Sequence, residues 1–373
     1  MEKIKTLKNS MPYCAIVILN YNAKEYLGKC LSSLQKLNYP KNRYKIILVD
    51  NASTDGSVEF VRKNFPKAEI IENRKNLGFS AGNNVALRSV DSDYYVLLNP
   101  DTFVDKNWLI NLVKVAESDD KVGLCSSKIL TMDDKSRINY AGGLINFLGF
   151  SWPRGFNKKD RGNFRTVEET GFASGASMLI KRKVLEEVGF LDEDFFMYQE
   201  DVDYSWRARL LGYKVLYVPS SILYHKVSFS VKSFMKSTLK YYYAEMNRLE
   251  TLLKNYSTKT LISLLPTMVL LETFLTLYFL ARYKSPLKIQ GFFKLIKSSK
   301  RILKKRYIIQ KSRTVDDRHI LQHFTTNLPR FFLSETLTDK IPDKLIMKLY
   351  KPLRSFLKFY YRLIKAVNGD LQA

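Results

Sequence analysis

Short apolar runs alternate with amphipathic stretches through the first half of the chain. The apolar runs have the character of β-strands, and the amphipathic stretches between them have the character of helices. This alternation predicts βαβ units and an α/β fold with a mostly parallel, twisted sheet flanked by helices. The predicted strands are YCAIVIL, YKIILVD, AEIIE, DYYVLL and VGLCSS, and the predicted helices are Lys24–Leu37, Ser57–Asn64, Ser80–Val90 and Asp105–Ser118.

Polar motifs follow three of the predicted strands at the point where each strand ends. NYN (20–22) follows the first strand, DNAS (50–53) the second and NPD (99–101) the fourth. In open α/β sheets, ligands bind beyond the carboxyl ends of the strands. We therefore expect a ligand site at this edge of the sheet.

The chain is large enough to bury a substantial core, and its charge is spread unevenly. It has 373 residues, of which 46% are hydrophobic, and a net charge of +25. Residues 231–373 hold 28 of the 61 Lys and Arg but 9 of the 36 Asp and Glu, a net charge of +19 against +6 for residues 1–230. Such a basic field favours nucleic acid or an anionic membrane surface as a partner.

The three cysteines indicate a reducing compartment. Cys14, Cys30 and Cys125 lie far apart and lack C-x-x-C spacing. They are expected to be reduced core residues of a cytoplasmic protein. The first residues contain no apolar run of the kind found in a secretory signal peptide.

Two motifs have the composition of nucleotide-binding loops, although turn chemistry accounts for each of them as well. In VDNASTDGS, Asp50 is placed to accept a hydrogen bond from a nucleobase ring, while Ser53 and Asp55 suit the cap of the next helix. In NLGFSAGNN, Gly78 and Gly82 allow the backbone to approach a ligand closely, and a helix start there favours a diphosphate. A capped strand-helix junction and a plain loop are the alternatives.

Carboxylates are concentrated in two further motifs. LNPDT supplies Asp101 directly after a strand, where a hard divalent cation finds oxygen ligands. QEDVD sets Glu200, Asp201 and Asp203 at the head of a predicted helix, and like charges this close raise at least one pKa, which suits a general base. His225 follows the strand-like run YKVLYVP. A turn residue, a solvated helix start and a surface histidine are the alternatives, but the order of these motifs predicts a metal-assisted transfer reaction.

These motifs resemble those of the family 2 glycosyltransferases, and within them the rhamnosyltransferase-like branch. The matching pieces are IVILNYN, VDNASTDGS, NLGFSAGNN, LNPDT, FASGASMLIKRKVLEEVGFLDEDFFMYQEDVDYSWRARLLGY and PSSILYH, in that order. The resemblance implies a GT-A fold, a single α/β domain that binds a nucleotide sugar and depends on Mg²⁺ or Mn²⁺. The predicted organisation is a tail (1–11), a catalytic domain (12–230) and a basic helical region (231–373) with an apolar segment (261–280).

The resemblance also implies the residues that bind the donor. Asp50 matches the position that contacts the nucleobase, and NLGFSAGNN matches the stretch that lines the ribose and diphosphate. Asn99 replaces the first acid of the family's metal-binding D-x-D element. The implied nucleotide-sugar-binding residues are Asn22, Asp50, Ser53, Asn76, Gly82, Asn83 and Asn99.

The remaining roles concern the metal, the base and the acceptor. Asp101 matches the final acid of the D-x-D element, and His225 matches the histidine that completes the metal site in several members. Asp201 matches the general base, with Glu200 beside it. Ser174 and Gly175 match the loop that flanks the acceptor. One base and no covalent intermediate predict a single displacement with inversion at the anomeric carbon.

The apolar segment 261–280 is long enough to cross a bilayer, but it contains Pro266 and Glu272. A single crossing would send the basic run 294–306 outside, against the positive-inside tendency. We therefore expect a segment that dips into one leaflet or lies along it, on the cytoplasmic face of the cell membrane. Two later stretches, Leu287–Ile309 and Ile341–Ile364, are predicted to be basic amphipathic helices. The alternative is a helical subdomain that packs on the catalytic domain.

Two rival functions belong to other classes. A nucleic-acid-binding protein would use the basic C-terminal region, but it leaves the acidic motifs of the first 230 residues unexplained. A non-catalytic scaffold that binds sugar nucleotides is the second rival, and the presence of Asp101, Asp201 and His225 argues against it. Within the resemblance, rhamnose from dTDP-rhamnose is the leading donor, with UDP-sugars and GDP-mannose as alternatives, and the acceptor is a glycan or a polyprenyl-linked sugar.

Overall fold

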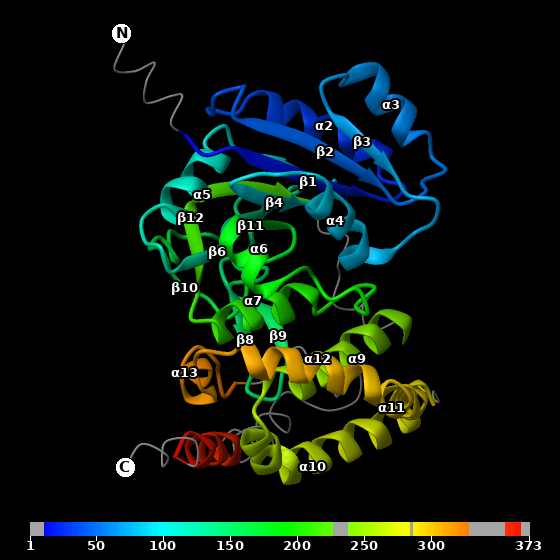
Figure 1. Ribbon diagram of the computed structural model, residues 1–373, viewed down its shortest axis with the longest axis vertical. Helices are drawn as coiled ribbons and strands as arrows, with labels where there is room; N and C mark the ends of the chain where they lie inside the picture. Colours follow the sequence, from blue (N-terminus) through cyan, green and yellow to red (C-terminus); the bar gives the residue numbers. More distant parts are fainter. Residues whose placement is uncertain (1–10, 227–237, 284–285, 328–354, 367–373) are drawn as a thin grey trace. The chain divides into compact units, whose positions relative to one another are not determined.

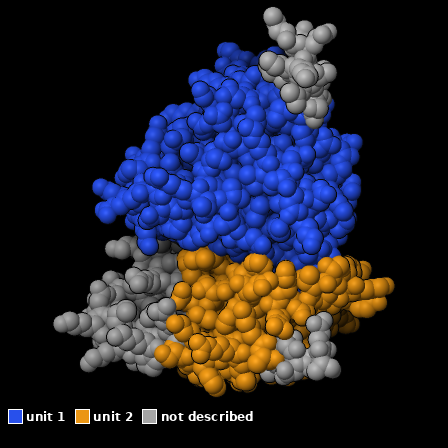
Figure 2. Space-filling model, turned by 90° about the vertical axis from the view of Figure 1, so that its left-hand side faces the viewer, with its two compact units in different colours: residues 1–143, 153–228 blue, residues 144–152, 229–373 orange. Residues whose placement is uncertain are grey.

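The computed structural model of the protein describes residues 11–226, 238–283, 286–327 and 355–366. They form two compact units, which Figure 2 colours separately. Unit 1 comprises residues up to 143 together with 153–228, and unit 2 comprises 144–152 together with the residues from 229 onward. The short segment 144–152, which the sequence analysis counted with the catalytic domain, thus belongs to unit 2.

Unit 1 begins with the βαβ units that the sequence predicts (Figure 1). Its strands β1 (Cys14–Asn20), β2 (Tyr44–Asp50), β3 (Glu69–Glu72) and β4 (Tyr94–Leu98) lie in the order β3-β2-β1-β4 and are all parallel. They are connected by helices α2 (Lys24–Gln35), α3 (Ser57–Asn64) and α4 (Gly78–Ser89). The order of the strands reverses between β1 and β4, and such a switch point forms a ligand crevice at the carboxyl ends.

The second half of the sheet is mixed. Strand β11 (Ser177–Lys181) runs antiparallel between β4 and β6 (Val122–Thr131), and β12 (Lys214–His225) runs parallel to β6. The short strands β5 (Thr102–Val104) and β10 (Glu168–Glu169) pair antiparallel with β12, and β7 (Ile138–Tyr140) pairs with β6. Helices α5 (Trp108–Ala116), α6 (Arg182–Val188) and α7 (Glu200–Leu210) complete the unit. The predicted α/β class is confirmed.

The core of unit 1 explains why its central strands read as continuous apolar runs. Every residue of β4 and almost every residue of β1 is buried, because helices cover both faces of a sheet of this kind. Cys14, Cys30 and Cys125 are free and buried, as predicted. Burial raises the pKa of each thiol to about 12, so the three groups are inert at neutral pH.

The described part of unit 2 is helical apart from a two-stranded sheet of β8 (Gly143–Ile145) and β9 (Ser151–Pro153). Its helices are α9 (Thr238–Asn255), α10 (Thr258–Tyr283), α11 (Leu287–Lys297), α12 (Ser299–Ser312), α13 (Asp317–Leu321) and a last helix over 355–366. The single helix predicted over Leu287–Ile309 is wrong, because the chain breaks at Ser298 and forms α11 and α12. The predicted tail up to residue 10 and most of the helix predicted over Ile341–Ile364 lie outside the described residues.

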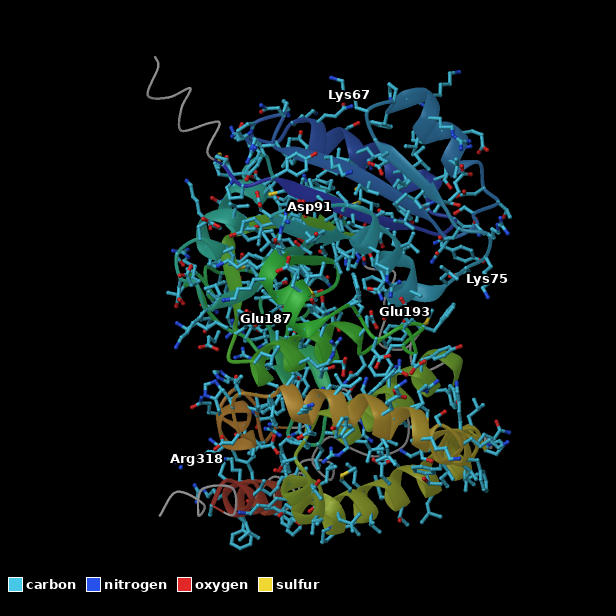
Figure 3. All side chains as sticks on the ribbon, in the orientation of Figure 1. Lys67, Lys75, Asp91, Glu187, Glu193 and Arg318 are labelled. Atoms are coloured by element: carbon cyan, nitrogen blue, oxygen red, sulfur yellow. The ribbon has the colours of Figure 1, made fainter. Side chains whose placement is uncertain are left out.

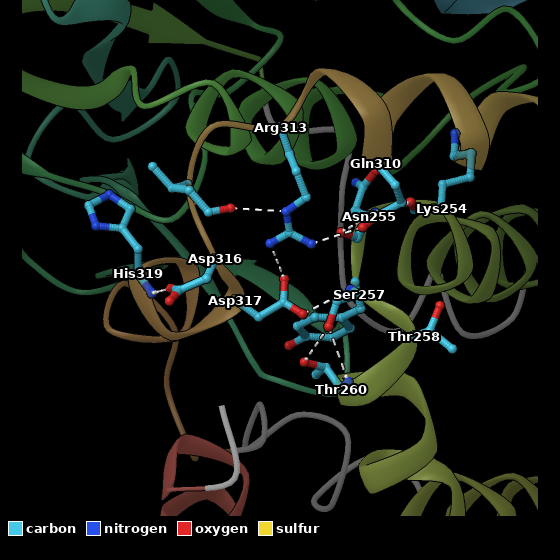
Figure 4. Close-up of polar contacts among 12 residues, drawn as sticks. Lys254, Asn255, Ser257, Thr258, Thr260, Gln310, Arg313, Asp316, Asp317 and His319 are labelled. Carbon is cyan, nitrogen blue, oxygen red and sulfur yellow. Dashed lines mark hydrogen bonds and ion pairs between the residues drawn. The ribbon is translucent and has the colours of Figure 1, made fainter. Parts of the chain in front are cut away.

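A polar network joins α12 and α13 to the junction of α9 and α10 (Figure 4). Asp317 accepts hydrogen bonds at Oδ2 from Ser257 N at 2.8 Å and at Oδ1 from Arg313 Nη2 at 2.7 Å. Gln310 Nε2 donates to the carbonyls of Lys254 and Asn255 at 2.9 and 3.0 Å. These bonds satisfy the last carbonyls of α9, which have no partner inside the helix, and fix the start of α10.

Candidate active site

The carboxyl ends of β1 and β2 carry one hydrogen-bonded cluster. Asn20 Nδ2 donates to Asp50 Oδ1 at 2.7 Å, and Ser53 N donates to Asp50 Oδ2 at 2.8 Å. Ser53 Oγ accepts from Asn22 N at 2.9 Å. The structure therefore brings together three of the predicted donor residues, Asn22, Asp50 and Ser53, at the switch point of the sheet. The cluster fixes the orientation of the Asp50 carboxylate.

The start of α4 is tied to the loop that precedes α7. Asn76 Oδ1 accepts from Gly78 N at 2.9 Å and from Asn51 Nδ2 at 3.2 Å. Gly78 has φ of 78°, and a Cβ there would lie 2.4 Å from the carbonyl oxygen of Phe196. Only glycine fits this position, because both its dihedral angle and its space exclude a side chain. The side chain of Asn76 holds this loop in shape.

Gly82 and Asn83 lie inside α4, and the structure gives each of them a packing role. A Cβ at Gly82 would lie 2.5 Å from Leu19 Cδ1, so the glycine lets α4 approach β1 closely. Asn83 is buried and donates from Nδ2 to the carbonyl of Phe79 at 2.9 Å. These contacts of Gly82 and Asn83 stabilise α4, which follows directly after the loop that Asn76 shapes.

Asp101 and His225 lie side by side although 124 residues separate them in the chain. The pairing of β5 with β12 sets His225 opposite Thr102, and this register brings Asp101 Oδ1 to 3.1 Å from His225 Nε2. We call these two residues the metal pair. Their side chains are 23% and 19% exposed, so a ligand can reach both.

The second ring nitrogen of His225 decides what the metal pair can bind. His225 Nδ1 lies 3.1 Å from Asn139 Oδ1, and Nε2 faces Asp101 Oδ1 at 3.1 Å. When Nδ1 of the neutral ring donates to the amide oxygen of Asn139, the lone pair of Nε2 is available to a metal ion. A lone pair that faces a carboxylate oxygen needs a proton or a cation between the two atoms. A carboxylate oxygen of Asp101 and an imidazole nitrogen of His225, whose ring Asn139 orients, are suitable ligands for a divalent transition metal. Asn99, predicted to bind the donor, sets its Nδ2 3.5 Å from His225 Nε2 and so lies at the metal pair.

Glu200 and Asp201 begin α7, directly after a strained turn. Tyr198 and Gln199 both have positive φ, 67° and 74°, which costs a non-glycine residue on the order of 1 kcal/mol or more. Strain of this kind is found at functional sites, where the surrounding structure imposes it. The turn sets both carboxyl groups at the N-terminus of α7.

Burial raises the pKa of both carboxyl groups. For Asp201, which is partly exposed, desolvation raises the pKa to about 6, although backbone N–H groups that donate to the carboxylate limit the rise. For Glu200, desolvation and then the charge of Asp201 raise the pKa well above its usual value. Glu200 Oε2 is buried and has no hydrogen-bond partner among the described residues. Burial of Glu200 and the charge of Asp201 thus both oppose a second negative charge on this pair of carboxyl groups.

The predicted acceptor loop connects Asp201 to the metal pair. Gly175 N donates to Asp201 Oδ2 at 3.1 Å, and a Cβ at Gly175 would lie 2.9 Å from the ring of Phe79. The next residue, Ala176, accepts at its carbonyl from Asn99 N at 3.3 Å. The backbone of Gly175 and Ala176 thus contacts Asp201, the predicted base, on one side and Asn99, which lies at the metal pair, on the other. The two predicted centres converge at one edge of the sheet.

The other residues of these two motifs have structural roles. Asp203 is fully buried and pairs with Arg207 Nε at 2.8 Å, one helical turn further on. Arg207 also donates to the backbone carbonyls of Val188, at the end of α6, and Phe190, at 3.0 Å each. Ser174 N donates to Ser126 Oγ at 3.1 Å. The three carboxylates therefore differ: Asp203 has a fixed cation partner, whereas Glu200 and Asp201 have raised pKa values.

The segment before α7 is held against α4. Asn84 Nδ2 donates to the carbonyl of Leu191 at 2.9 Å, and Leu191 N donates back to Asn84 Oδ1 at 3.1 Å. Glu193, labelled in Figure 3, accepts from Asn84 Nδ2 at 2.9 Å and pairs with Arg88 at 2.6 Å. These bonds position the strained turn and hence Asp201.

Residues 15–189 match the family model described as glycosyl transferase family 2. This part of the chain is a family 2 glycosyltransferase domain. The match ends before α7, so the assignment of Asp201 and His225 depends on the geometry above. The chain is accordingly a nucleotide-sugar-dependent glycosyltransferase.

Curated relatives agree with this family. The chain is 26% identical over 233 residues to N-acetylglucosaminyl-diphospho-decaprenol L-rhamnosyltransferase of Mycobacterium tuberculosis (strain ATCC 25618 / H37Rv), covering 57% of this chain and 75% of that protein. It is 28% identical over 247 residues to rhamnosyltransferase WbbL of Escherichia coli (strain K12), covering 61% and 91%. Among solved structures, GalNAc-T7 with UDP, GalNAc and Mn2+ superposes with a TM-score of 0.50 at 16% identity, covering 60% of this chain and 44% of that one. The predicted GT-A fold is confirmed.

Sequence reasoning gave no role to two residues that position the site. Asn20 orients Asp50, and its place at the end of a buried strand was a usable signal. Asn139 orients His225 from β7, a strand of three residues in a segment without any motif. Only the pairing of β6 with β7 brings it to the histidine, so no local pattern could have found it.

Proposed function

We propose that this glycosyltransferase uses Asp201 as the general base of a single displacement that inverts the anomeric carbon. The observation that supports this proposal is the convergence of Asp201 with the metal pair at one sheet edge. A base of raised pKa and a site for a cation are the two groups that such a reaction needs at neutral pH.

In the proposed reaction the acceptor hydroxyl gives its proton to the Asp201 carboxylate. The hydroxyl oxygen forms a bond to the anomeric carbon while the bond from that carbon to the diphosphate oxygen breaks. Gly175 N keeps the carboxylate oriented, and a protonated Glu200 leaves a single negative charge on the pair. Asp201 thus stays ionised above a pH of about 6.

The cation would be held by Asp101 and His225. When bound, it would neutralise the charge that develops on the departing nucleotide diphosphate. An imidazole ligand favours Mn²⁺ over Mg²⁺, which prefers oxygen ligands alone. We therefore propose Mn²⁺ as the better cofactor for this chain. The donor base and ribose are proposed to lie at Asp50, Ser53 and the loop that Asn76 shapes.

The proposed donor is dTDP-rhamnose, and the proposed acceptor is a lipid-linked glycan at the cytoplasmic face of the cell membrane. Both relatives described above are named as rhamnosyltransferases, and one is named for a diphospho-decaprenol acceptor. A lipid-linked acceptor also agrees with the basic, apolar composition of residues 231–373.

A donor screen tests the proposed function. Thermal unfolding is followed with dTDP-rhamnose, UDP-glucose, UDP-N-acetylglucosamine and GDP-mannose, each with and without Mn²⁺, since a ligand that binds only the folded state raises the melting temperature. We expect Mn²⁺-dependent stabilisation by dTDP-rhamnose, abolished in Asp101→Asn and kept in the control Asp91→Asn. Stabilisation by a UDP- or GDP-sugar alone would overturn the rhamnose assignment. Stabilisation that is equal without Mn²⁺ would overturn the metal site.

A further inference from the structure

One side of α10 is exposed and uncharged over its whole apolar length. Six of its large apolar side chains are each 57–66% exposed, and Leu280 is 36% exposed; the six are Ile262, Leu265, Val269, Leu270, Phe274 and Leu277. Between residues 260 and 281 of the sequence, Glu272 is the only Asp, Glu, Lys, Arg or His, and its side chain is 12% exposed. Contiguous apolar surface of this extent is rare on a soluble monomer and marks an interaction site.

The opposite side of α10 is bound to unit 2. Leu264 and Leu275 are buried, and Glu272 takes part in a cluster of ionised groups from three helices. Arg248 of α9 pairs with Glu272, and Lys288 Nζ of α11 lies 2.7 Å from Glu272 Oε2. The cluster fixes which side of α10 faces the protein.

A second buried carboxylate completes this cluster. Lys288 Nζ lies 2.8 Å from Glu245 Oε1, and Arg248 Nε donates to Glu245 Oε2 at 3.1 Å. Burial alone would raise the pKa of Glu245, but Arg248 and Lys288 outweigh it and lower the pKa to about 2. The charges of the two carboxylates and the two cations therefore neutralise each other inside unit 2.

This cluster is incompatible with a bilayer crossing by α10. Glu272 lies near the middle of the helix, so a crossing would carry it into the hydrocarbon core. Its partners Arg248 and Lys288 would have to follow it or leave it unpaired, and either outcome is costly in a bilayer. By length and hydropathy alone, Thr258–Leu277 could cross a membrane. The buried charge cluster around Glu272 argues instead for a helix that stays on one side of the bilayer.

The last described helix extends the apolar face and adds positive charge. Tyr360 Oη donates to the carbonyl of Ser263, which places helix 355–366 beside the start of α10 (Figure 1). Phe356, Phe359 and Leu363 on this helix are 43–66% exposed. Lys358 and Arg362 on the same helix are also exposed. Exposed apolar and basic side chains on one helix are typical of helices that lie in an anionic membrane interface.

We propose that α10 and helix 355–366 form one membrane-binding face that lies in the plane of an anionic bilayer and does not cross it. The exposed side of α10 enters the boundary between headgroups and acyl chains, while Lys358 and Arg362 contact the anionic headgroups. The Glu272 cluster stays in the protein. This surface is separate from the donor chemistry of unit 1, so its binding can be measured without transfer activity.

Vesicle binding tests the face. The full-length protein is mixed with sealed vesicles of phosphatidylcholine alone or with about 30% phosphatidylglycerol, whose negative surface attracts basic segments, and bound protein is separated by flotation. We expect binding to the anionic vesicles, weakened about tenfold or more by the double variant Leu270→Gln/Phe274→Gln. Val167→Gln, an exposed apolar residue of unit 1, is the matched control and should bind like wild type. Equal binding by the double variant, or a lipid-free dimer that the double variant dissociates, would overturn the proposal.

Labelling distinguishes the in-plane placement from a crossing. Thr258 is the first residue of α10 and Lys300 lies beyond its end; both positions are exposed, and the three native cysteines are buried. Single variants Thr258→Cys and Lys300→Cys are bound to sealed anionic vesicles and treated with a membrane-impermeant maleimide from outside. We expect both positions to react to the same extent. Protection of one position until the vesicles are lysed would mean that α10 crosses the bilayer, which would overturn the proposal.

Discussion

Replacing Asp201 by Asn tests the assignment of the general base. The amide keeps the size of the side chain and one acceptor oxygen, so the hydrogen bond from Gly175 N can persist. It cannot take a proton from the acceptor hydroxyl. Because general-base catalysis contributes about 10²–10⁴-fold, we expect kcat/KM to fall by about that factor while donor affinity is unchanged.

The pH profile gives the magnitude from the structure. Asp201 acts as a base only when ionised, and its pKa is raised to about 6, so activity rises with pH through that value. The ionised fraction is about 0.1 at pH 5 and about 0.97 at pH 7.5, which predicts about a tenfold difference in kcat/KM. An aspartate with an ordinary pKa of about 3.9 would lose less than about a tenth of its activity at pH 5.

The assay is a steady-state measurement with dTDP-rhamnose or the donor that the screen identifies. The enzyme is saturated with Mn²⁺ at each pH, because metal binding itself depends on pH. Glu200→Gln is the matched control, since a protonated Glu200 is mimicked by an amide, and its kcat/KM should stay within about tenfold of wild type. If Glu200→Gln loses activity and Asp201→Asn keeps it, or if the profile is flat from pH 5 to 7.5, the assignment of the base is refuted.

Three further changes test the supporting structure. Gly78→Ala should lower the free energy of unfolding by about 2–4 kcal/mol, because its Cβ would meet a backbone carbonyl. Gly56→Ala is the control: Gly56 has the left-handed helical conformation and its Cβ would meet only the ends of side chains, so it should cost about 1 kcal/mol, and equal losses in thermal unfolding would contradict the clash. Asn139→Ala should weaken Mn²⁺ binding about 10–100-fold by calorimetry, since the amide orients the metal-binding imidazole, and an unchanged affinity would exclude that role. Glu272→Gln should destabilise unit 2 by about 3 kcal/mol in denaturant titrations, because it leaves two buried cations short of a carboxylate; wild-type stability would show that the cluster does not hold α10.

The first half of the fold could be predicted because its strands are buried on both faces. β2 matches its predicted range residue for residue, and α3 does as well. The short strands β5, β7 and β10 were not predicted, since two or three residues carry no periodic signal and form only when a distant partner strand is present. The break at Ser298 was missed for a related reason: the apolar spacing continues across it, although the helix does not.

In the site, too, the local sequence predicted the residues at strand ends but not the contacts between distant segments. The ends of β1, β2 and β4 could be located from the sequence, and so could the residues there. The contact of Asp101 with His225 depends on the register of β5 against β12, which no local pattern encodes. The pairing of Asp203 with Arg207 at spacing four was visible in the sequence and would have separated the structural acid from the reactive pair.

The proposed mechanism requires that Asp101 and His225 bind the same cation. Pulsed electron paramagnetic resonance of bound Mn²⁺ tests it directly, because a coordinated imidazole gives a ¹⁴N coupling. The chain has three histidines, and His225 is the one in unit 1. We predict a single-histidine ¹⁴N coupling in the Mn²⁺–nucleotide complex, absent in His225→Ala, with Mn²⁺ affinity lost in Asp101→Asn. A wild-type complex without nitrogen coupling, or one whose coupling survives in His225→Ala, would contradict the account.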